Sequence, residues 1–468
     1  MRFDAAWSYA GRTGTVRDID VTWTERWSLG GASDLRRVTV SLPIPADINV
    51  PALVAAGIPL TTMVVTISAG GRELLSGNLR ASSYGQAGEP VEGEVGDDER
   101  EDQAIIPAPL LVVDSVTWPD APADSLRSPY PFVFGTPGVS GTRTIPATPA
   151  IVVDATVGAE YLLVSAGHVA ATSVTIWGPQ YPGAELMAAV SMGVESRLDG
   201  RGQPVTVAPV YLFGQVGYPA WSTSARYYVS WTGGEAFPGR LDRLATALLG
   251  QSTLEVDEVA QASQAAALSR YQCAGYVDAG VAPSELLSRI VEALPVSMQR
   301  SPEGMYLAGW AADIEDAPIS HAIIVGQGAH RDGQVRYVVD DPTVSVRLEY
   351  AYDLQRGAYS AAAAVGAAQT LRGSRGPGRA AAVDAGHVYD PATAEAAALS
   401  MLTGSSRWRE LGLVVDEDRY GWGADRELRV GQVVAVTDAT VSIAAERARI
   451  VAIERDRGGM RVTLRLRG

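Results

Sequence analysis

The chain has 468 residues, of which 47% are hydrophobic and 19% are charged, and its formal net charge is −15. This apolar content is enough for packed cores and argues against a disordered chain. The acidic excess repels phosphate backbones, so nucleic-acid binding over a large surface is disfavoured. All 38 basic residues are arginine, which excludes a Schiff-base lysine, a P-loop lysine and a lysine general base.

The single cysteine, Cys273, excludes an internal disulfide and a cysteine-based zinc site, and it is compatible with a reducing cytosol. The N-terminal residues alternate in polarity from Met1 onward and lack the charged and apolar regions of a secretory signal. No apolar run reaches the roughly 18 residues that a transmembrane helix needs. We therefore expect neither export by a signal of its own nor a transmembrane segment.

The first hundred residues predict a small antiparallel β unit. Ile19, Val21 and Trp23 alternate with polar residues, which indicates a half-buried strand. A second alternating run covers 38–42, and residues 62–80 predict a hairpin that turns at Gly70-Gly71. We expect residues 1–103 to form an N-terminal β-barrel.

Residues 104–235 differ in character, because prolines and short apolar runs alternate along them. Frequent turn signals between short strands indicate an all-β sandwich or barrel. Aromatic residues are concentrated between Trp177 and Trp231, which would suit a glycan-binding surface, although buried strand-face aromatics are commoner. We expect a β-sandwich-like insertion here with a binding role.

Helical patterns appear only after Pro238. Apolar residues fall on one helical face over 241–250 and again over 283–295, and an alanine-rich stretch lies between them. This predicts a mixed helical and β part over 236–334. Residues 335–468 alternate again and predict a C-terminal β-barrel with one helix, which Asp390 would cap.

The predicted fold class is therefore mainly β with a minor α part. We expect several small antiparallel β-barrels or sandwiches plus a short helical segment, in a multidomain chain.

The histidines and the cysteine do not form a catalytic pattern. His168 and His387 each lie in a predicted turn, and His321 and His330 are too far apart for one helical face. A turn histidine that satisfies a backbone group is the expected role of His168, with a general base or ligand as the alternative. Cys273 has no neighbouring histidine, so we expect a packed thiol rather than a nucleophile.

The acidic residues also favour a structural interpretation. Acidic side chains crowd 91–103, and adjacent acids occur at Asp97-Asp98 and Asp340-Asp341. Asp416 and Asp418 resemble part of a calcium loop, although Tyr420 stands where a ligand is expected. Sequence-adjacent acids on loops are usually solvated, and we predict no catalytic, metal-binding or cofactor-binding residue and no cofactor.

Three segments resemble the tail-hub or baseplate-hub proteins of long-tailed bacteriophages and related tail-like particles. The first is Gly71-Arg72-Glu73-Leu74-Leu75-Ser76-Gly77-Asn78-Leu79 in the N-terminal unit. The second is the helix 284–294 with the strands after it. The third is the C-terminal order of a helix, then 428–436, 449–456 and a last strand over 462–466.

This resemblance implies a structural, non-enzymatic virion component, made in the host cytoplasm and located in the virion tail. Such hubs form an oligomeric ring, with a homotrimer favoured, that connects the tail tube or distal tail ring to the central fibre or tip. The acidic charge would suit a lumen through which DNA only passes. Residues 104–235 match no hub segment, and they would contact a glycan or receptor. The alternatives are a glycan- or receptor-binding tail protein and a tail-associated cell-wall hydrolase.

Overall fold

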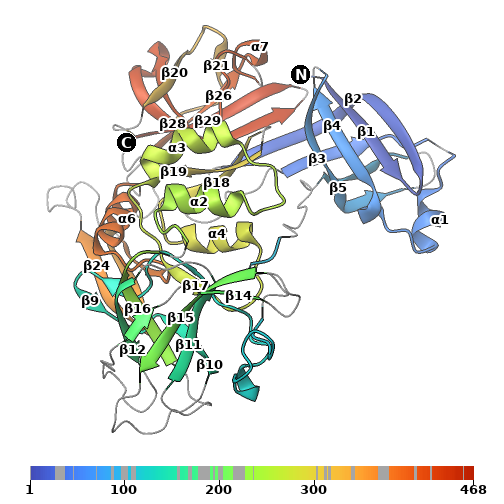
Figure 1. The fold of residues 1–468 in the computed structure, drawn as a ribbon. Helices are drawn as coiled ribbons and strands as arrows, with labels where there is room; N and C mark the ends of the chain where they lie inside the picture. The colour runs from blue at the N-terminus through green and yellow to red at the C-terminus, as the bar shows by residue number, and fades with distance from the viewer. Residues whose placement is uncertain are drawn as a thin grey trace.

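The computed structural model shows the elements grouped into a β-barrel at one side, a stack of helices in the centre, and a sheet above and below the stack (Figure 1). The structure describes residues 2–26, 37–45, 47–69, 71–85, 89–95, 104–106, 112–154, 159–166, 171–177, 190–192, 195–198, 204–213, 227–235, 237–301, 304–309, 314, 318–338, 343–366, 379–404, 408–421, 424–456 and 458–467.

The N-terminal unit is a closed six-stranded barrel. Its strands follow the order β1-β4-β5-β6-β3-β2, and a β1–β2 pairing closes the ring. The alternate side chains predicted to point inward, Ile19, Val21 and Trp23 among them, are buried in one apolar core. The elements are β1 (Phe3–Tyr9), β2 (Arg12–Arg26), β3 (Arg37–Leu42), α1 (Val50–Ala55), η1 (Leu60–Thr62), β4 (Val64–Ala69), β5 (Arg72–Tyr84) and β6 (Val91–Val95).

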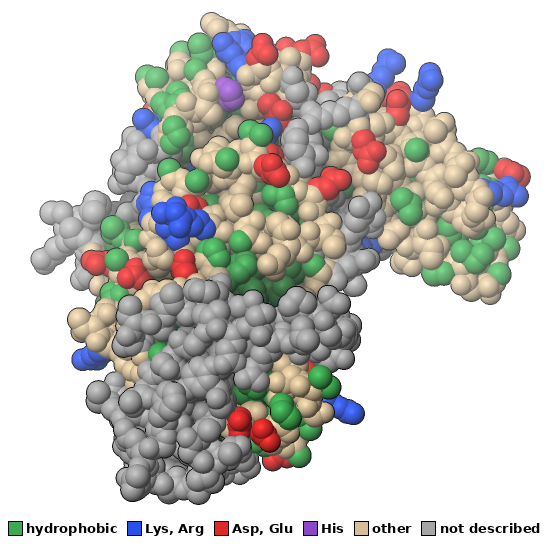
Figure 2. Space-filling model, viewed as in Figure 1, with side chains coloured by type: hydrophobic (Ala, Val, Ile, Leu, Met, Phe, Trp, Pro, Cys, Tyr) green, Lys and Arg blue, Asp and Glu red, His purple; other side chains and the backbone are tan. Residues whose placement is uncertain are grey.

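The tip of this barrel is apolar. The sequence carries no charged residue from Ile48 to Gly71, a stretch that includes α1 and the short helix η1. Leu53, Val54 and Ile58 are only half-buried there. Figure 2 shows hydrophobic side chains gathered at this end of the molecule.

The C-terminal unit is a sheet around a second core, in which Leu411, Leu413 and Val415 are buried as their alternation predicts. Among the described residues its pairing order is open between β20 and β21, so closure into a barrel stays a prediction. The elements are β20 (Ile319–Ile324), β21 (Ala329–Arg331), β22 (Arg336–Val338), β26 (Trp408–Val415), α7 (Glu417–Tyr420), β27 (Val433–Asp438), η3 (Ala439–Val441), β28 (Ile443–Asp456) and β29 (Gly459–Arg467).

One strand pair joins the two units. The end of β2 pairs antiparallel with the end of β28, from Trp23 opposite Arg455 to Arg26 opposite Ala452. This pairing merges the barrel and the C-terminal strands into one sheet of 13 strands. Residues more than 400 positions apart in sequence therefore lie side by side (Figure 1).

The centre of the molecule combines helices with small sheets over the largest core cluster. The apolar faces predicted for 241–250 and 283–295 are buried in it, which confirms both helices. The elements are β7 (Phe132–Phe134), α2 (Leu241–Leu249), α3 (Glu258–Leu268), β17 (Gly275–Val277), α4 (Pro283–Val291), β18 (Val296–Ser301), β19 (Gly304–Gly309), β23 (Thr343–Asp353), β24 (Ala358–Gly366), β25 (Arg379–Ala385) and α6 (Pro391–Gly404).

A seven-stranded antiparallel sheet lies below the helices (Figure 1). Beside it, Trp118 donates a hydrogen bond to the Tyr130 hydroxyl at 2.8 Å in a small satellite core. The elements are η2 (Ala123–Ser125), β8 (Val139–Ser140), β9 (Arg143–Thr144), β10 (Thr148–Asp154), β11 (Ala159–Ala166), β12 (Ala171–Trp177), β13 (Val190–Met192), β14 (Glu195–Leu198), β15 (Pro204–Phe213) and β16 (Tyr227–Gly233).

The predicted fold class, mainly β with a minor α part in several units, is confirmed. The predicted cap of the late helix is confirmed as well, because the Asp390 carboxylate accepts a hydrogen bond from the Thr393 N–H at 2.8 Å. One strand starts later than expected: the run predicted from Leu428 contains a turn at Gly431, where φ is +89°, and β27 begins only at Val433. The division at 103, 235 and 334 stays a prediction.

None of the helices that the structure describes is long and apolar enough to cross a membrane.

Candidate functional site

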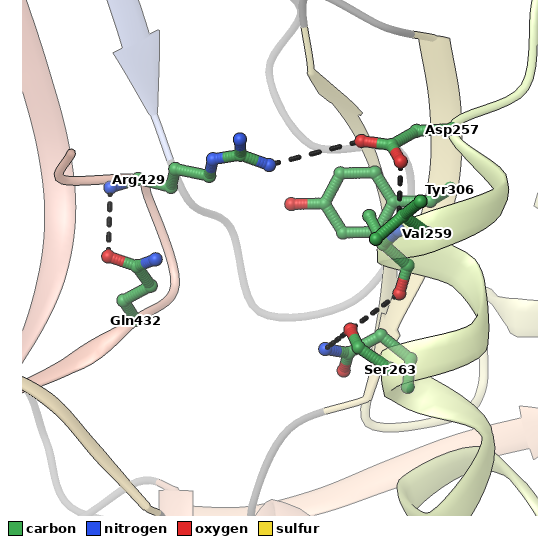
Figure 3. Close-up of a pocket in the computed structure, with 8 residues that line it drawn as sticks. Asp257, Val259, Ser263, Tyr306, Arg429 and Gln432 are labelled. Carbon is green, nitrogen blue, oxygen red and sulfur yellow. Dashed lines mark hydrogen bonds and ion pairs between the residues drawn. The ribbon is translucent and has the colours of Figure 1, made fainter. Parts of the chain in front are cut away.

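A groove of about 490 Å³ lies between the central helices and the C-terminal unit (Figure 3). One wall consists of the first turns of α3 with a residue of β19, and the opposite wall is the turn before β27. Its lining residues are Asp257, Val259, Ala260, Ser263, Gln264, Tyr306, Arg429 and Gln432.

Asp257 holds the first wall together. It is the N-cap of α3, and its carboxylate accepts a hydrogen bond from the Ala260 N–H at 2.8 Å. The other carboxylate oxygen lies 3.9 Å from a guanidinium nitrogen of Arg429, which reaches across the groove (Figure 3). Arg429 also approaches Glu427 at 3.3 Å. The arginine therefore lies between two carboxylates that belong to different units.

Amide side chains order the rest of the lining. The Gln432 side-chain oxygen accepts a hydrogen bond from the Arg429 N–H at 3.0 Å, which shapes the turn before β27. The Gln264 side-chain oxygen accepts one from the Gly309 N–H at 3.3 Å. Val259 is 83% exposed at the rim. The groove thus offers a guanidinium and amides together with an exposed apolar side chain.

This set of groups suits binding better than catalysis. Among the eight lining residues there is no histidine or cysteine, and the Ser263 hydroxyl donates to the backbone oxygen of Ala260 at 2.6 Å. A serine nucleophile needs a neighbouring base, and the lining supplies none. Asp257 is occupied by its helix cap and by Arg429. The sequence did not single out this groove, because its two walls are about 170 positions apart.

The predicted turn position of His387 is confirmed, and its ring lies 5.7 Å from that of Phe134. Burial, with the positive charge of Arg289 as a smaller cause, lowers the pKa of His387 to about 4. A neutral imidazole packed beside an aromatic ring is a structural feature.

The other histidines do not gather with it. His321 lies in β20 and His330 in β21, on opposite ends of the pairing order of the C-terminal unit. His168 lies outside the described residues. Within the part of the chain that the structure describes, no three His, Cys, Asp or Glu side chains form a group that could hold a metal ion.

Cys273 is a buried free thiol, and burial raises its pKa to about 12. It lies after the end of α3, outside any helix. Its N–H donates to the backbone oxygen of Gly239 at 2.8 Å. A thiol so far from ionisation is a packing group, as predicted.

The acidic pairs divide into one structural pair and others outside the described residues. Asp416 is the N-cap of α7 and accepts a hydrogen bond from the Asp418 N–H at 3.0 Å. The resemblance to a calcium loop is thus explained by a capped helical turn, with Tyr420 buried behind it. Asp97-Asp98 and Asp340-Asp341 lie outside the described residues.

The aromatic residues of 104–235 that the structure describes lie mostly inside. Trp118, Trp177, Tyr227 and Trp231 are buried, which agrees with core packing rather than with an exposed glycan platform.

The joint between the two β units carries a buried ion pair. The Arg455 side chain is 1% exposed, and its guanidinium lies 3.2 Å from the Glu25 carboxylate. The Trp23 indole N–H donates to the same carboxylate oxygen at 2.8 Å. The three side chains sit within the β2–β28 pairing, so charge neutralisation and strand pairing occur at the same place.

Comparison with known proteins finds similar chains among solved phage tail structures. The 43 kDa tail protein of prophage MuSo2 from Shewanella oneidensis is similar over 99% of this chain and 98% of that one, with 10% identity and a TM-score of 0.43. Prophage tail protein gp18 from Listeria monocytogenes is similar over 99% and 94%, with 8% identity and a TM-score of 0.33. A tail protein from Neisseria meningitidis is similar over 72% and 96%, with 14% identity and a TM-score of 0.27.

No protein-family profile matches the chain. No curated protein matches it either.

Proposed function

We propose that this chain is a structural component of a phage tail, located in the baseplate of the virion. Its role there is that of a hub, which connects the tail tube or distal tail ring to the central fibre or tip. The observation that carries this proposal is the continuous sheet through β2 and β28, with the buried Arg455–Glu25 pair inside it. The order of β units that resembled hub proteins supports it further.

A continuous sheet is a suitable connection for a part that transmits force. Four residue pairs across β2 and β28 join the units through backbone hydrogen bonds, and a buried ion pair tolerates little change in geometry. Two units held in this way act as one rigid body, whereas a flexible linker would leave their relative orientation free.

Partners of a hub are other proteins, and protein contacts need accessible apolar surface and free strand edges rather than reactive groups. The apolar patch around α1, which lies beside the exposed Arg12–Asp47 ion pair, provides such a surface (Figure 2). We propose a homo-oligomer, with a homotrimer favoured, and contacts with the distal tail or tube protein and the fibre or tip protein. The net charge of −15 suits a lumen that DNA passes without binding.

Immunogold electron microscopy of native tail particles, with an antibody to this chain, tests the proposal. Labelling at the baseplate end of the tail is expected, next to the distal ring. Labelling at the head end, or particles that lack the chain, would contradict it. Three-dimensional reconstruction of the same particles gives the copy number, for which we expect three.

Cell-wall zymography of the purified chain separates this proposal from the hydrolase alternative, since a structural hub leaves the wall intact. A carbohydrate array tests the glycan-binding alternative, which predicts that residues 104–235 bind a glycan on the array.

A further inference from the structure

The three-stranded sheet β24-β23-β25 has two outer edges. β24 pairs antiparallel with β23 on one side, and β25 pairs parallel with β23 on the other. Among the described residues no further strand joins either edge, and no backbone hydrogen bond outside the sheet involves residues 358–366 or 379–384. Within the described part of the chain, both edges therefore have backbone donors and acceptors that no other strand pairs.

The β24 edge lacks the features that keep natural edges from pairing. Such edges are short, or carry charged residues, prolines or bulges. β24 is nine residues long, contains no charged residue and no proline, and keeps one register with β23 throughout. It lies at the side of the molecule, next to α6 (Figure 1).

The apolar layer above the sheet is also incomplete at both edges. On β24 the residues Ala361, Ala363 and Val365 pack against the central core, but each is only half-buried. On β25 the residues Ala381 and Val383 do the same.

Above this layer, α6 packs on β23 and β24 and leaves Leu399 49% exposed. A strand added to either edge would cover these side chains as well as pair the backbone.

We propose that β24 of one copy pairs antiparallel with β25 of a second copy. β24 and β25 run in opposite directions within one sheet, so adding copies edge to edge produces an antiparallel pair. Directly opposed residues then point to the same face, so the half-buried rows of the two strands meet on one side. A pairing of β24 with itself would leave the β25 edge uncovered. The inference rests on the proposed homo-oligomeric hub, and it identifies the strands that join its subunits.

Cysteine cross-linking tests the pairing. Ala364→Cys on β24 and Ala382→Cys on β25 place thiols on exposed positions, while Cys273 is buried. Within one chain both positions flank Arg347, about 10 Å apart across two strand spacings, beyond the roughly 7 Å limit for a direct disulfide. Oxidation is therefore expected to join the double variant only between chains. The matching single variants are expected to stay unlinked.

Cross-linking can either support or contradict the proposed pairing. Covalent multimers of the double variant alone support the pairing of β24 with β25. Efficient dimers of Ala364→Cys alone would show a two-fold pairing of β24 with itself and overturn the proposal. Ala262→Cys, which is exposed on α3, measures the background from collisions. A short bismaleimide used in parallel detects the same contact where the register is shifted by two residues.

Charge substitution gives a second test. The double variant Ala362→Lys/Ala364→Lys is expected to weaken self-association at least about tenfold in sedimentation velocity, because lysines on an edge strand oppose pairing. Ala262→Lys/Ala266→Lys, at two exposed alanines on α3, is the matched control and is expected to leave self-association unchanged. Unaltered association of the β24 variant, or a wild-type chain that stays monomeric at its highest soluble concentration, would overturn the inference. Labelling of tail particles tests the hub proposal separately.

Discussion

Arg455 and Glu25, 430 positions apart in the chain, form an ion pair at 3.2 Å inside the joint between the first barrel and the C-terminal unit. Their strands, β28 and β2, are adjacent there, and the Arg455 side chain is almost fully enclosed. The first and last parts of the chain therefore stabilise each other directly.

Arg455→Met is expected to lower the free energy of unfolding by about 3 kcal/mol, because it leaves the Glu25 carboxylate without its charge partner in an enclosed site. Urea unfolding measures the change. Arg461→Met is the control: its side chain is 49% exposed, so removing its surface ion pairs is expected to cost less than about 1 kcal/mol. Equal effects of the two substitutions would argue against a buried pair that fixes the joint.

Gly14→Ala is expected to destabilise the first barrel by about 1–3 kcal/mol, the usual cost of overpacking a core. Gly14 lies opposite Trp7 across β1 and β2, and an added Cβ would stand 2.6 Å from the indole ring. Trp7 is 4% exposed and has little room to move. Tryptophan fluorescence during urea unfolding measures the effect. Thr13→Ser, on the exposed side of the same strand, should leave the urea concentration at the midpoint of unfolding unchanged.

Asp257→Ala is expected to cost about 1 kcal/mol, because the first turn of α3 loses its cap. Asp257→Asn keeps a side-chain oxygen for the cap but removes the charge opposite Arg429, so its effect should be smaller. Thermal unfolding compares the two variants. Glu258→Ala, exposed at the next position, controls for charge near the helix start. If Asp257→Asn lowers the thermal stability as much as Asp257→Ala does, the ion pair with Arg429 contributes more to stability than the helix cap.

Stability is expected to fall with decreasing pH because of His387. Its pKa is about 4 in the folded state and about 6.5 when unfolded, so the folded state binds fewer protons between these values. The contribution is fully present above about pH 6.5, is lost as pH falls towards 4, and amounts to at most about 3.5 kcal/mol. His387→Gln should flatten this part of the pH profile of unfolding.

Cys273 is expected to resist thiol reagents in the native protein. Burial raises its pKa to about 12, so the reactive thiolate is scarce at neutral pH, and the sulfur is inaccessible. Labelling with a chromogenic disulfide should proceed only as fast as the protein opens, and it should accelerate with urea in parallel with unfolding. Fast labelling in native buffer would contradict the enclosed position.

Local patterns account for what the sequence determined by itself. The alternation at Ile19, Val21 and Trp23 depends on a strand with one buried face, and the helical stripe over 283–295 depends on a single apolar side. Asp390 caps a helix through a contact within three residues. Such features are encoded by neighbours in sequence, so the mainly β fold class could be predicted.

Only the tertiary structure decided which distant segments meet. The joint of β2 with β28, the groove between Asp257 and Arg429, and the edge of β24 that no described strand pairs each depend on how elements far apart in the chain are arranged. Strand alternation predicts which face of a strand is buried. It does not predict which strand lies beside it, because every strand edge has the same backbone donors and acceptors. Sequence thus predicted many of the elements and their inner faces but not β24 and β25, and packing determined the surfaces from which we argue function.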